Sequence, residues 1–252
     1  LPYGGADTVY AIERHEPLNG ETCQAVEVRG AGEESGIEQP VYLPCHRVRD
    51  YTACLYVRGD GAPLRVSLRH GNRELDAWQI AGVTEEWQRF EGTLRLPEDA
   101  VRSGELYALR IGFSRPGRIC VGSVELFPAD HVSGFDPDVV RLMKNAHISL
   151  YRFPGGNFVS GYHWRDGVGP REKRPVRYNE PWHQLEPNHM GTDEHLEFCR
   201  LIGAEPVICV NAGNGSPEEA AAWVEYVNGP ADSEMGRLRV AIGHTEPYGV
   251  QY

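Results

Sequence analysis

The first half of the chain alternates hydrophobic and polar residues over short stretches that are separated by turn signals. From Leu64 to Leu68, for example, Leu, Val and Leu alternate with Arg and Ser. A period of two is typical of β-strands with one face on a core and the other in water. The predicted strands are 24–29, 38–43, 50–58, 64–69, 87–96, 105–113 and 119–127. About seven or eight short strands at this spacing predict an antiparallel β-sandwich or jelly roll.

After Pro128 the pattern changes to helices that alternate with near-continuous apolar strands. The predicted helices start at residues 137, 192 and 217, and the predicted strands cover 149–153 and 205–211. Capping signals mark the helix ends: Asp136 before the first helix, Gly203 after the second, and Ser216 before the third. This order predicts a parallel sheet covered by helices, with its functional edge at the carboxyl ends of the strands.

Residues 129–252 hold two clear β/α units and the start of a third strand at 248–252, whereas a closed eight-stranded barrel needs about 250 residues. The predicted fold is therefore a β-sandwich (jelly roll) in residues 1–128, followed by an incomplete (β/α)8 TIM barrel in residues 129–252. The chain begins at Leu1 rather than Met, with neither a basic nor an apolar leader segment. We interpret it as part of a longer protein that has no visible signal peptide.

Composition narrows the classes of function. The 252 residues include 25 Lys and Arg against 36 Asp and Glu, which gives a net charge of −11 and a pI near 5.4. An acidic chain disfavours phosphate backbones and anionic membrane surfaces, so neither nucleic acid nor a membrane is an expected partner. The sequence also contains no run of about 18 apolar residues, which a transmembrane helix would need.

The cysteines and histidines predict neither a metal site nor a cofactor. The six cysteines form no C-x-x-C pair and mostly lie in apolar runs such as 51–57, so we interpret them as reduced core residues. Four histidines between 163 and 195 lack the spacing of a helical metal site, which favours polar loop and helix-face roles. The glycine-rich turn at 213–215 lacks the lysine of a phosphate-binding loop.

Four motifs in the second half resemble the α-L-arabinofuranosidases of glycoside hydrolase family 51. They are Leu150-Tyr-Arg-Phe-Pro-Gly-Gly-Asn157 with its continuation to Pro175, Trp182 with Glu186-Pro-Asn-His-Met-Gly-Thr-Asp-Glu194, Ala204-Glu-Pro-Val-Ile-Cys-Val-Asn211, and Ser216-Pro-Glu-Glu219 with Trp223-Val-Glu-Tyr226. The resemblance runs from about residue 119 to residue 252. Residues 8–127 resemble the carbohydrate-binding-type jelly roll (a carbohydrate-binding module) that some members carry before this part of the barrel.

The resemblance implies a retaining glycosidase on a (β/α)8 barrel. In the family, one Glu after the fourth strand protonates the leaving oxygen and a second Glu on the seventh strand attacks the anomeric carbon. Retention requires that these two carboxyl groups lie about 5–5.5 Å apart. The segment 247–252 resembles the residues just before the family's Trp-x-x-Gly-Asn-Glu signature. Both catalytic Glu residues, and the substrate-binding Glu of the first strand, are therefore expected outside this sequence, and none of its residues is assigned a catalytic role.

The resemblance assigns substrate-binding roles to six residues, namely Arg152, Gly155, Gly156, Asn157, Trp182 and Asn211. Arg152 matches an Arg beside the nucleophile, where a permanent positive charge would keep a carboxylate ionised. Asn157 matches a position that hydrogen-bonds the arabinose hydroxyls, and Trp182 matches an aromatic residue that stacks on the sugar on the leaving-group side. The two glycines let the backbone turn tightly beneath the sugar. Asn211, at the end of the next strand, points to the same edge.

Structural roles compete with several of these assignments. Without the resemblance, Arg152 could be a barrel salt-bridge residue, and Trp182 could simply pack within its loop. A general acid/base set could be suggested by the carboxylates of Glu186, Asp193 and Glu194. However, Asp193 and Glu194 lie in the first turn of a predicted helix, where negative charge suits the helix dipole.

The predicted sandwich leaves its own role open. A sugar platform could be built from its aromatic residues Tyr51, Tyr56, Trp78, Trp87 and Tyr107. Core packing is the more common fate of aromatic residues in alternating strands, so a structural role is favoured. Domains of this type often hold calcium through an Asp in the last strand, but Gly122 stands at that position here, which disfavours calcium.

We expect the complete parent protein to be an exo-acting α-L-arabinofuranosidase that releases terminal arabinose from arabinoxylan or arabinan oligosaccharides, as part of hemicellulose degradation and L-arabinose metabolism. Its expected partner is an arabinose-containing oligo- or polysaccharide, and homo-oligomerisation stays open. Reduced cysteines and the absence of a visible signal peptide favour a cytoplasmic location. The alternatives are an endo-glucanase of the same family and a non-catalytic carbohydrate-binding remnant.

Overall fold

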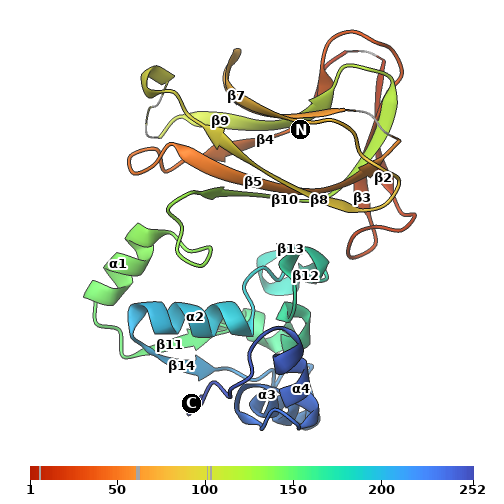
Figure 1. Ribbon diagram of the computed structural model, residues 1–252. Coiled ribbons are helices and arrows are strands. Elements are labelled where there is room, and N and C mark those ends of the chain that lie inside the picture. Colours follow the sequence, from red (N-terminus) through yellow and green to blue (C-terminus); the bar gives the residue numbers. More distant parts are fainter. Residues whose placement is uncertain (6, 61–62, 101, 103) are drawn as a thin grey trace. The chain divides into compact units, whose positions relative to one another are not determined.

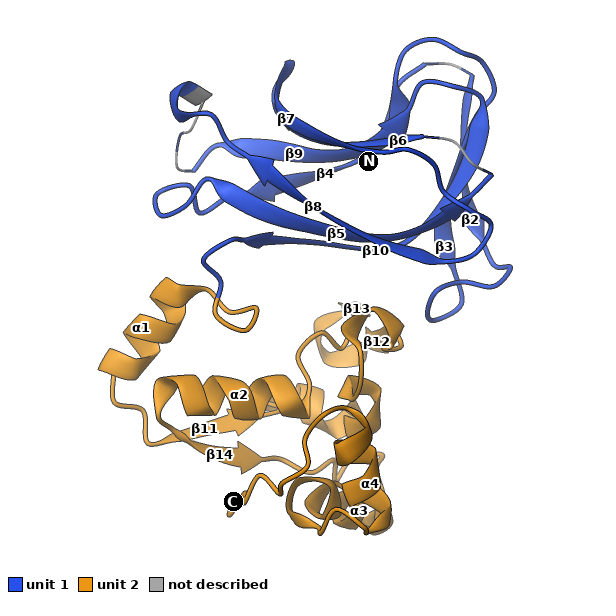
Figure 2. Cartoon of the chain, in the orientation of Figure 1, with its two compact units in different colours: residues 1–131 blue, residues 132–252 orange. Residues whose placement is uncertain are grey.

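The computed structural model describes residues 1–5, 7–60, 63–100, 102 and 104–252. The chain divides into two compact units, Leu1–His131 and Val132–Tyr252 (Figure 2).

The first unit is an antiparallel β-sandwich of two five-stranded sheets (Figure 1). One sheet has the order β1 (Pro2–Tyr3), β4 (Ser35–Tyr42), β9 (Leu106–Phe113), β6 (Leu64–His70) and β7 (Arg73–Ile80). The other has the order β2 (Thr8–Glu13), β3 (Cys23–Val28), β10 (Gly117–Pro128), β5 (Asp50–Gly59) and β8 (Gln88–Arg95), and a short helix η1 (Glu98–Ala100) follows β8. The predicted antiparallel sandwich is confirmed.

The alternating positions supply the core between the two sheets. Leu64, Val66 and Leu68 of β6 are each at most 1% exposed, and Leu109 and Ile111 of β9 are also buried. Burying such side chains stabilises a fold by about 1.5–3 kcal/mol each. The period of two therefore identified the strand faces that hold this unit together.

The sequence pattern missed three strands, β1, β2 and β7. β2 lies at the edge of its sheet, and its Ile12 is 63% exposed. Its hydrophobic and polar residues therefore do not mark a buried and an exposed face. In β7 a bulge between Leu68 and Arg69 of the partner strand shifts the register and interrupts the period of two. The two-residue loop that joins β6 to β7 starts at Gly71, whose φ of 55° suits a tight hairpin, so this turn was the available signal.

Most of the aromatic residues considered for a sugar platform serve packing. Tyr51 and Tyr107 are each 1% exposed and belong to the core. Trp78 packs against the core and covers Gly92, where an added Cβ would lie 2.3 Å from the indole. Trp87 is half-buried, and its Nε1 donates to the Glu16 carbonyl at 2.9 Å.

None of the six cysteines forms a disulfide, and five of them are buried, as the sequence predicted for core residues.

The second unit contains a two-stranded parallel sheet covered by helices (Figure 1). β11 (Leu150–Phe153) pairs with β14 (Glu205–Ile208), and the helices are α1 (Pro137–Asn145), α2 (Thr192–Ile202), α3 (Pro217–Asn228) and α4 (Glu234–Ala241). The segment between β11 and α2 forms short 3-10 turns and a small hairpin: η2 (Gly156–Gly161), η3 (Trp164–Gly167), η4 (Arg171–Lys173), β12 (Arg177–Asn179), η5 (Glu180–Trp182) and β13 (Gln184–Glu186). The predicted parallel pairing is confirmed.

The capping signals are confirmed at all three helices. The Asp136 carboxylate accepts from the first backbone N–H groups of α1, and the Ser216 hydroxyl accepts from Glu219 N at 3.1 Å. Gly203 ends α2 in the left-handed region with φ 77°. These residues fix the helix boundaries through local chemistry, which explains why the sequence located them.

One expectation for this unit was wrong, and one helix was not predicted. Residues 248–252 do not form a strand, although Ile208 N donates to the Tyr252 carbonyl at 3.0 Å. The sequence pattern also missed α4, because its buried face consists of Met235, Gly236 and Arg239 rather than an apolar stripe.

None of the helices formed by the described residues is long and apolar enough to cross a membrane.

His195 on α2 makes the stability of this unit depend on pH. Its side chain is fully buried and stacks with the rings of Tyr151 and Phe153, at centroid distances of 5.9 and 5.5 Å. Burial lowers the pKa of His195 from 6.5 to about 4. The unfolded chain therefore binds a proton that the folded chain excludes. Stability is fully present above about pH 6.5 and falls as the pH drops toward 4, by about 3 kcal/mol at most.

Unfolding followed from pH 7 to pH 4 checks this expectation. His195→Leu should flatten the pH dependence of the second unit, whereas His189→Leu, at an exposed position, should leave it as in the parent chain. An equally steep dependence in His195→Leu would contradict the assignment to His195.

Candidate functional site

The carboxyl end of β11 continues into a glycine-containing loop that carries the first candidate residues. Arg152 is exposed and makes no ion pair or hydrogen bond with the residues that the structure describes. A Cβ added at Gly155 would lie 3.9 Å from Nη2 of Arg152, so the guanidinium lies beside this loop. Gly156 adopts φ 60°, a left-handed conformation that favours glycine. The loop thus presents an unpaired cation next to a tight turn.

Trp182 reaches the same loop from a distant part of the sequence. It ends η5, whose N-cap Asn179 accepts from Trp182 N at 3.3 Å. The indole is 61% exposed, and its Cζ2 would lie 4.0 Å from a Cβ added at Gly156. Asn157, next to Gly156, is exposed, and its Oδ1 accepts from the Ser160 hydroxyl at 3.3 Å. Five of the six candidate residues therefore lie around one loop.

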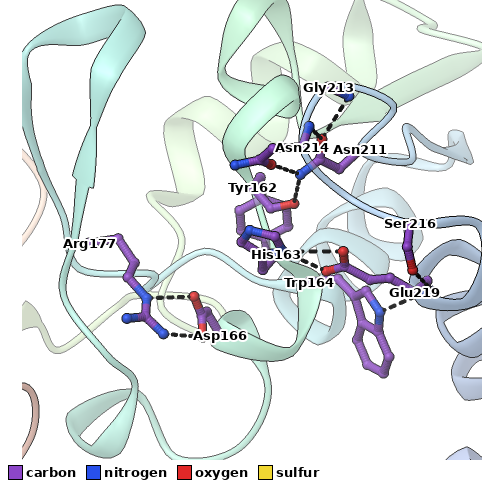
Figure 3. Close-up of polar contacts among 10 residues, drawn as sticks. All are labelled: Tyr162, His163, Trp164, Asp166, Arg177, Asn211, Gly213, Asn214, Ser216 and Glu219. Carbon is purple, nitrogen blue, oxygen red and sulfur yellow. Dashed lines mark hydrogen bonds and ion pairs between the residues drawn. The ribbon is translucent and has the colours of Figure 1, made fainter.

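Asn211 occupies a different environment from the other five. It is 9% exposed, and its Nδ2 donates to the Tyr162 carbonyl at 3.1 Å and to Asn214 Oδ1 at 2.7 Å (Figure 3). Its Oδ1 accepts from Gly213 N and Asn214 N. The side chain thereby ties the loop after β14 to the loop after β11.

Two further polar contacts hold the loop segment, and the sequence shows no sign of them. His163 Nδ1 lies 2.9 Å from Glu219 Oε1, and the Arg177 guanidinium binds Asp166 at 2.7 and 3.0 Å (Figure 3). Residue types alone could not reveal the first pair, because its members are 56 positions apart.

A buried ion pair joins the loop segment to α2. Arg174 is 3% exposed and binds both carboxylate oxygens of Glu194, at 2.8 and 2.9 Å. Burial acts to raise the pKa of Glu194, but the hydrogen bonds and charge of Arg174, together with Gly191 N and the charge of Arg171, outweigh it and hold the pKa below its usual value. The same carboxylate accepts from Gly191 N at 2.9 Å, as helix-start chemistry predicts. Glu194 is therefore a structural carboxylate.

Asp193 is also engaged by its neighbours. It accepts hydrogen bonds from the hydroxyls of Tyr226 and Tyr248. Burial, together with this carboxylate, raises the pKa of both phenols. Glu186 differs from both, because it accepts only from Asn188 N, at 3.0 Å, among the described residues. No group of three or more metal-binding side chains occurs in the described part of the chain.

The arginine, the asparagine and the exposed tryptophan thus lie at the carboxyl edge of a parallel β/α sheet, which is where β/α folds carry their ligand sites. The family model described as "Alpha-L-arabinofuranosidase 1 domain" matches residues 142–252. The resemblance to the α-L-arabinofuranosidases of glycoside hydrolase family 51 is thereby confirmed, and the second unit of the chain is related to them.

Similar proteins support this relationship. The "Probable alpha-L-arabinofuranosidase C" of Aspergillus fumigatus is 46% identical over 125 residues, which cover 50% of this chain and 25% of that protein. The protein of the same name from Aspergillus niger is 49% identical over 120 residues, or 48% and 24% of the two chains. The "Intracellular exo-alpha-(1->5)-L-arabinofuranosidase" of Halalkalibacterium halodurans is 40% identical over 124 residues, or 49% and 25%. The matched segment thus spans about a quarter of each relative.

One solved structure matches both units. The arabinose-bound MgGH51 α-L-arabinofuranosidase has a TM-score of 0.84 and covers 100% of this chain, which corresponds to 46% of that chain. The sequence identity is 21%, so this likeness concerns the fold.

Proposed function

We propose that this chain is part of a retaining α-L-arabinofuranosidase that releases terminal α-L-arabinofuranosyl residues from arabinoxylan or arabinan oligosaccharides. One observation carries the proposal: Arg152, Asn157 and Trp182 gather around one glycine loop at the carboxyl end of β11. This loop belongs to the segment matched by the arabinofuranosidase family model.

Each of these residues has a role that suits its environment. The exposed, unpaired guanidinium of Arg152 would lie beside the nucleophilic carboxylate and keep it ionised. Asn157 would hydrogen-bond the arabinose hydroxyls, and the exposed indole of Trp182 would stack on the sugar at the leaving-group side. Gly155 and Gly156 have no side chains, so the backbone of the loop can pass close beneath the sugar. Since the side chain of Asn211 is buried and hydrogen-bonded, we assign it to ordering the loops rather than to sugar contact.

The proposal extends to the domains and to the setting of the protein. We propose that residues 1–128 form a carbohydrate-binding-module-like jelly roll and that residues 129–252 form the N-terminal part of a (β/α)8 barrel. β11 and β14 would then be consecutive barrel strands, and the two catalytic Glu residues would come from other barrel strands. Five buried cysteines that form no disulfide suit a reducing compartment, which supports a cytoplasmic location.

A segment exchange tests the proposed activity. Residues 142–252 would replace the matching segment of the Aspergillus niger relative, and hydrolysis of a chromogenic α-L-arabinofuranoside would be measured. We expect the exchanged protein to be active and the 252-residue chain alone to be inactive. In the exchanged protein, Arg152→Ala should lower kcat/KM by about 10²–10³-fold, since it removes a preorganised charge.

Arg200→Ala is the matched control. Arg200 is also exposed, but on α2, where it pairs with Glu197 at 2.6 Å. This variant should keep the rate of the exchanged protein. An unchanged rate in Arg152→Ala would overturn the role given to Arg152, and a folded but inactive exchanged protein would overturn the proposed activity.

A further inference from the structure

Ser160 connects the candidate sugar-binding loop to the loop that follows β14. It lies three residues after Asn157 in η2, and side chains three positions apart lie on the same side of a 3-10 helix. The Ser160 hydroxyl donates to Oδ1 of Asn157 at 3.3 Å, and the Ser160 backbone carbonyl accepts from Asn214 N at 3.2 Å. One serine therefore contacts both loops.

The loop after β14 is a firm support for Ser160. A Cβ added at Gly213 would lie 2.5 Å from the Ser160 carbonyl oxygen and 2.9 Å from its Cα, so the two segments are in close backbone contact. The buried side chain of Asn211 holds this loop in place, because its Oδ1 accepts from the backbone N–H groups of Gly213 and Asn214 (Figure 3). The position of Ser160 is thus set by backbone contacts and one buried amide.

The contact with Ser160 decides which hydrogen-bonding group of Asn157 stays available. An asparagine amide can present either its oxygen, which accepts, or its nitrogen, which donates. The Ser160 hydroxyl engages Oδ1. In the part of the chain that the structure describes, Nδ2 of Asn157 donates to no other residue. Its two N–H donors match the hydroxyl oxygens of a sugar.

We propose that Ser160 is a positioning residue, which orients Asn157 so that Nδ2 donates to a hydroxyl oxygen of the arabinose. This inference rests on the proposed function, in which Asn157 binds the arabinose, and it adds the residue that orients Asn157. An amide held in its binding orientation loses less conformational entropy when the sugar binds. The bond from Ser160 is exposed and long for an O–H···O hydrogen bond, so its loss should cost a several-fold factor in affinity.

Ser160→Ala in the exchanged protein tests the proposal, with hydrolysis of the chromogenic α-L-arabinofuranoside as the readout. We expect KM to rise about fivefold with kcat nearly unchanged, because an interaction lost equally from bound substrate and transition state changes KM alone. Ser160→Thr keeps the hydroxyl and should keep the KM of the unmodified exchanged protein. Ser149→Ala, at an exposed serine just before β11, is the matched control and should change neither constant.

A double-mutant cycle separates the orientation of Asn157 from an independent role of Ser160. Asn157→Ala should raise KM by more than Ser160→Ala does, and adding Ser160→Ala to Asn157→Ala should cause no further rise. A further fivefold rise would show that Ser160 acts independently of Asn157 and would overturn the proposal. An unchanged KM in Ser160→Ala, or an equal rise in Ser160→Thr, would also overturn it.

A measurement on the 252-residue chain makes the test independent of catalysis. ¹⁵N relaxation of the Asn157 side-chain amide should show a restrained group in the unmodified chain and in Ser160→Thr, and a mobile group in Ser160→Ala. If the exchanged protein is inactive but this change in mobility is seen, the proposed activity falls and the positioning of Asn157 stands. Equal mobility in Ser160→Ala and the unmodified chain would overturn the positioning, whatever the activity of the exchanged protein.

Discussion

Arg174→Met is expected to destabilise the second unit by about 3–5 kcal/mol. Arg174 is 3% exposed and forms a two-pronged ion pair with Glu194. Its guanidinium also donates to the backbone carbonyls of Gly169 and Asn188, each at 2.9 Å. Removal of the arginine leaves the Glu194 carboxylate buried without its principal counter-charge, which is the costly way to break such a pair. Chemical unfolding of the whole chain, with the sandwich transition as an internal reference, provides the measurement.

Arg171→Met supplies the matched control for this ion pair. Arg171 approaches the same carboxylate at 3.4 Å, but its side chain is 26% exposed and makes the weaker contact. We expect a loss of about 0.5–1 kcal/mol, as for partly exposed pairs. Equal losses in the two variants would show that the cost does not come from the burial of Glu194.

Gly191→Ala is expected to destabilise the same unit by about 3 kcal/mol or more. A Cβ at Gly191 would lie 1.9 Å from the carbonyl oxygen of Gly167 and 2.8 Å from its carbonyl carbon. Both contacts involve backbone, so no flexible side chain can move away, and the chain must separate where the two segments cross. Gly191 has φ −125°, which any residue adopts, so the expected loss is steric. The unfolding transition of the second unit measures it.

Gly161→Ala is the control for the crossing at Gly191. Gly161 ends η2, has no neighbouring atom within 4 Å of an added Cβ and has a negative φ. Its replacement should change the free energy of unfolding by less than about 1 kcal/mol. If Gly191→Ala unfolded no more easily than Gly161→Ala, the close approach of the two backbones would be refuted.

The sequence located features that depend on neighbouring residues. Alternation identified the core faces of strands such as β6 and β9, and capping chemistry located the starts of α1 and α3 and the end of α2. It missed α4 because a buried Arg239 stands where an amphipathic helix would carry an apolar residue. The guanidinium is satisfied there by backbone carbonyls, including those of Tyr226 and Gly229 near the end of α3. The spacing of apolar residues does not mark a helix whose buried face carries a cation that donates to backbone carbonyls.

The candidate site also combines residues that the sequence predicted correctly with features that only the fold shows. The sequence proposed Arg152, Asn157 and Trp182 through motif resemblance, and the structure places them around one loop. The sequence also proposed Asn211, whose side chain is directed to loop contacts in the structure. The pocket lined by Phe158, Tyr178 and Glu186 had no signal in the sequence, because its walls come from several turns and a hairpin whose paths depend on distant partners.

The sequence by itself therefore determined the faces of the strands, the ends of three helices and the resemblance of the second unit to the α-L-arabinofuranosidases. These depend on interactions within a few residues or on contiguous motifs. The tertiary structure alone decided which charges are buried together and where a pocket forms. Arg174 meets Glu194 across 20 positions and His163 meets Glu219 across 56, and only the folded path of the loops brings such groups within hydrogen-bond distance.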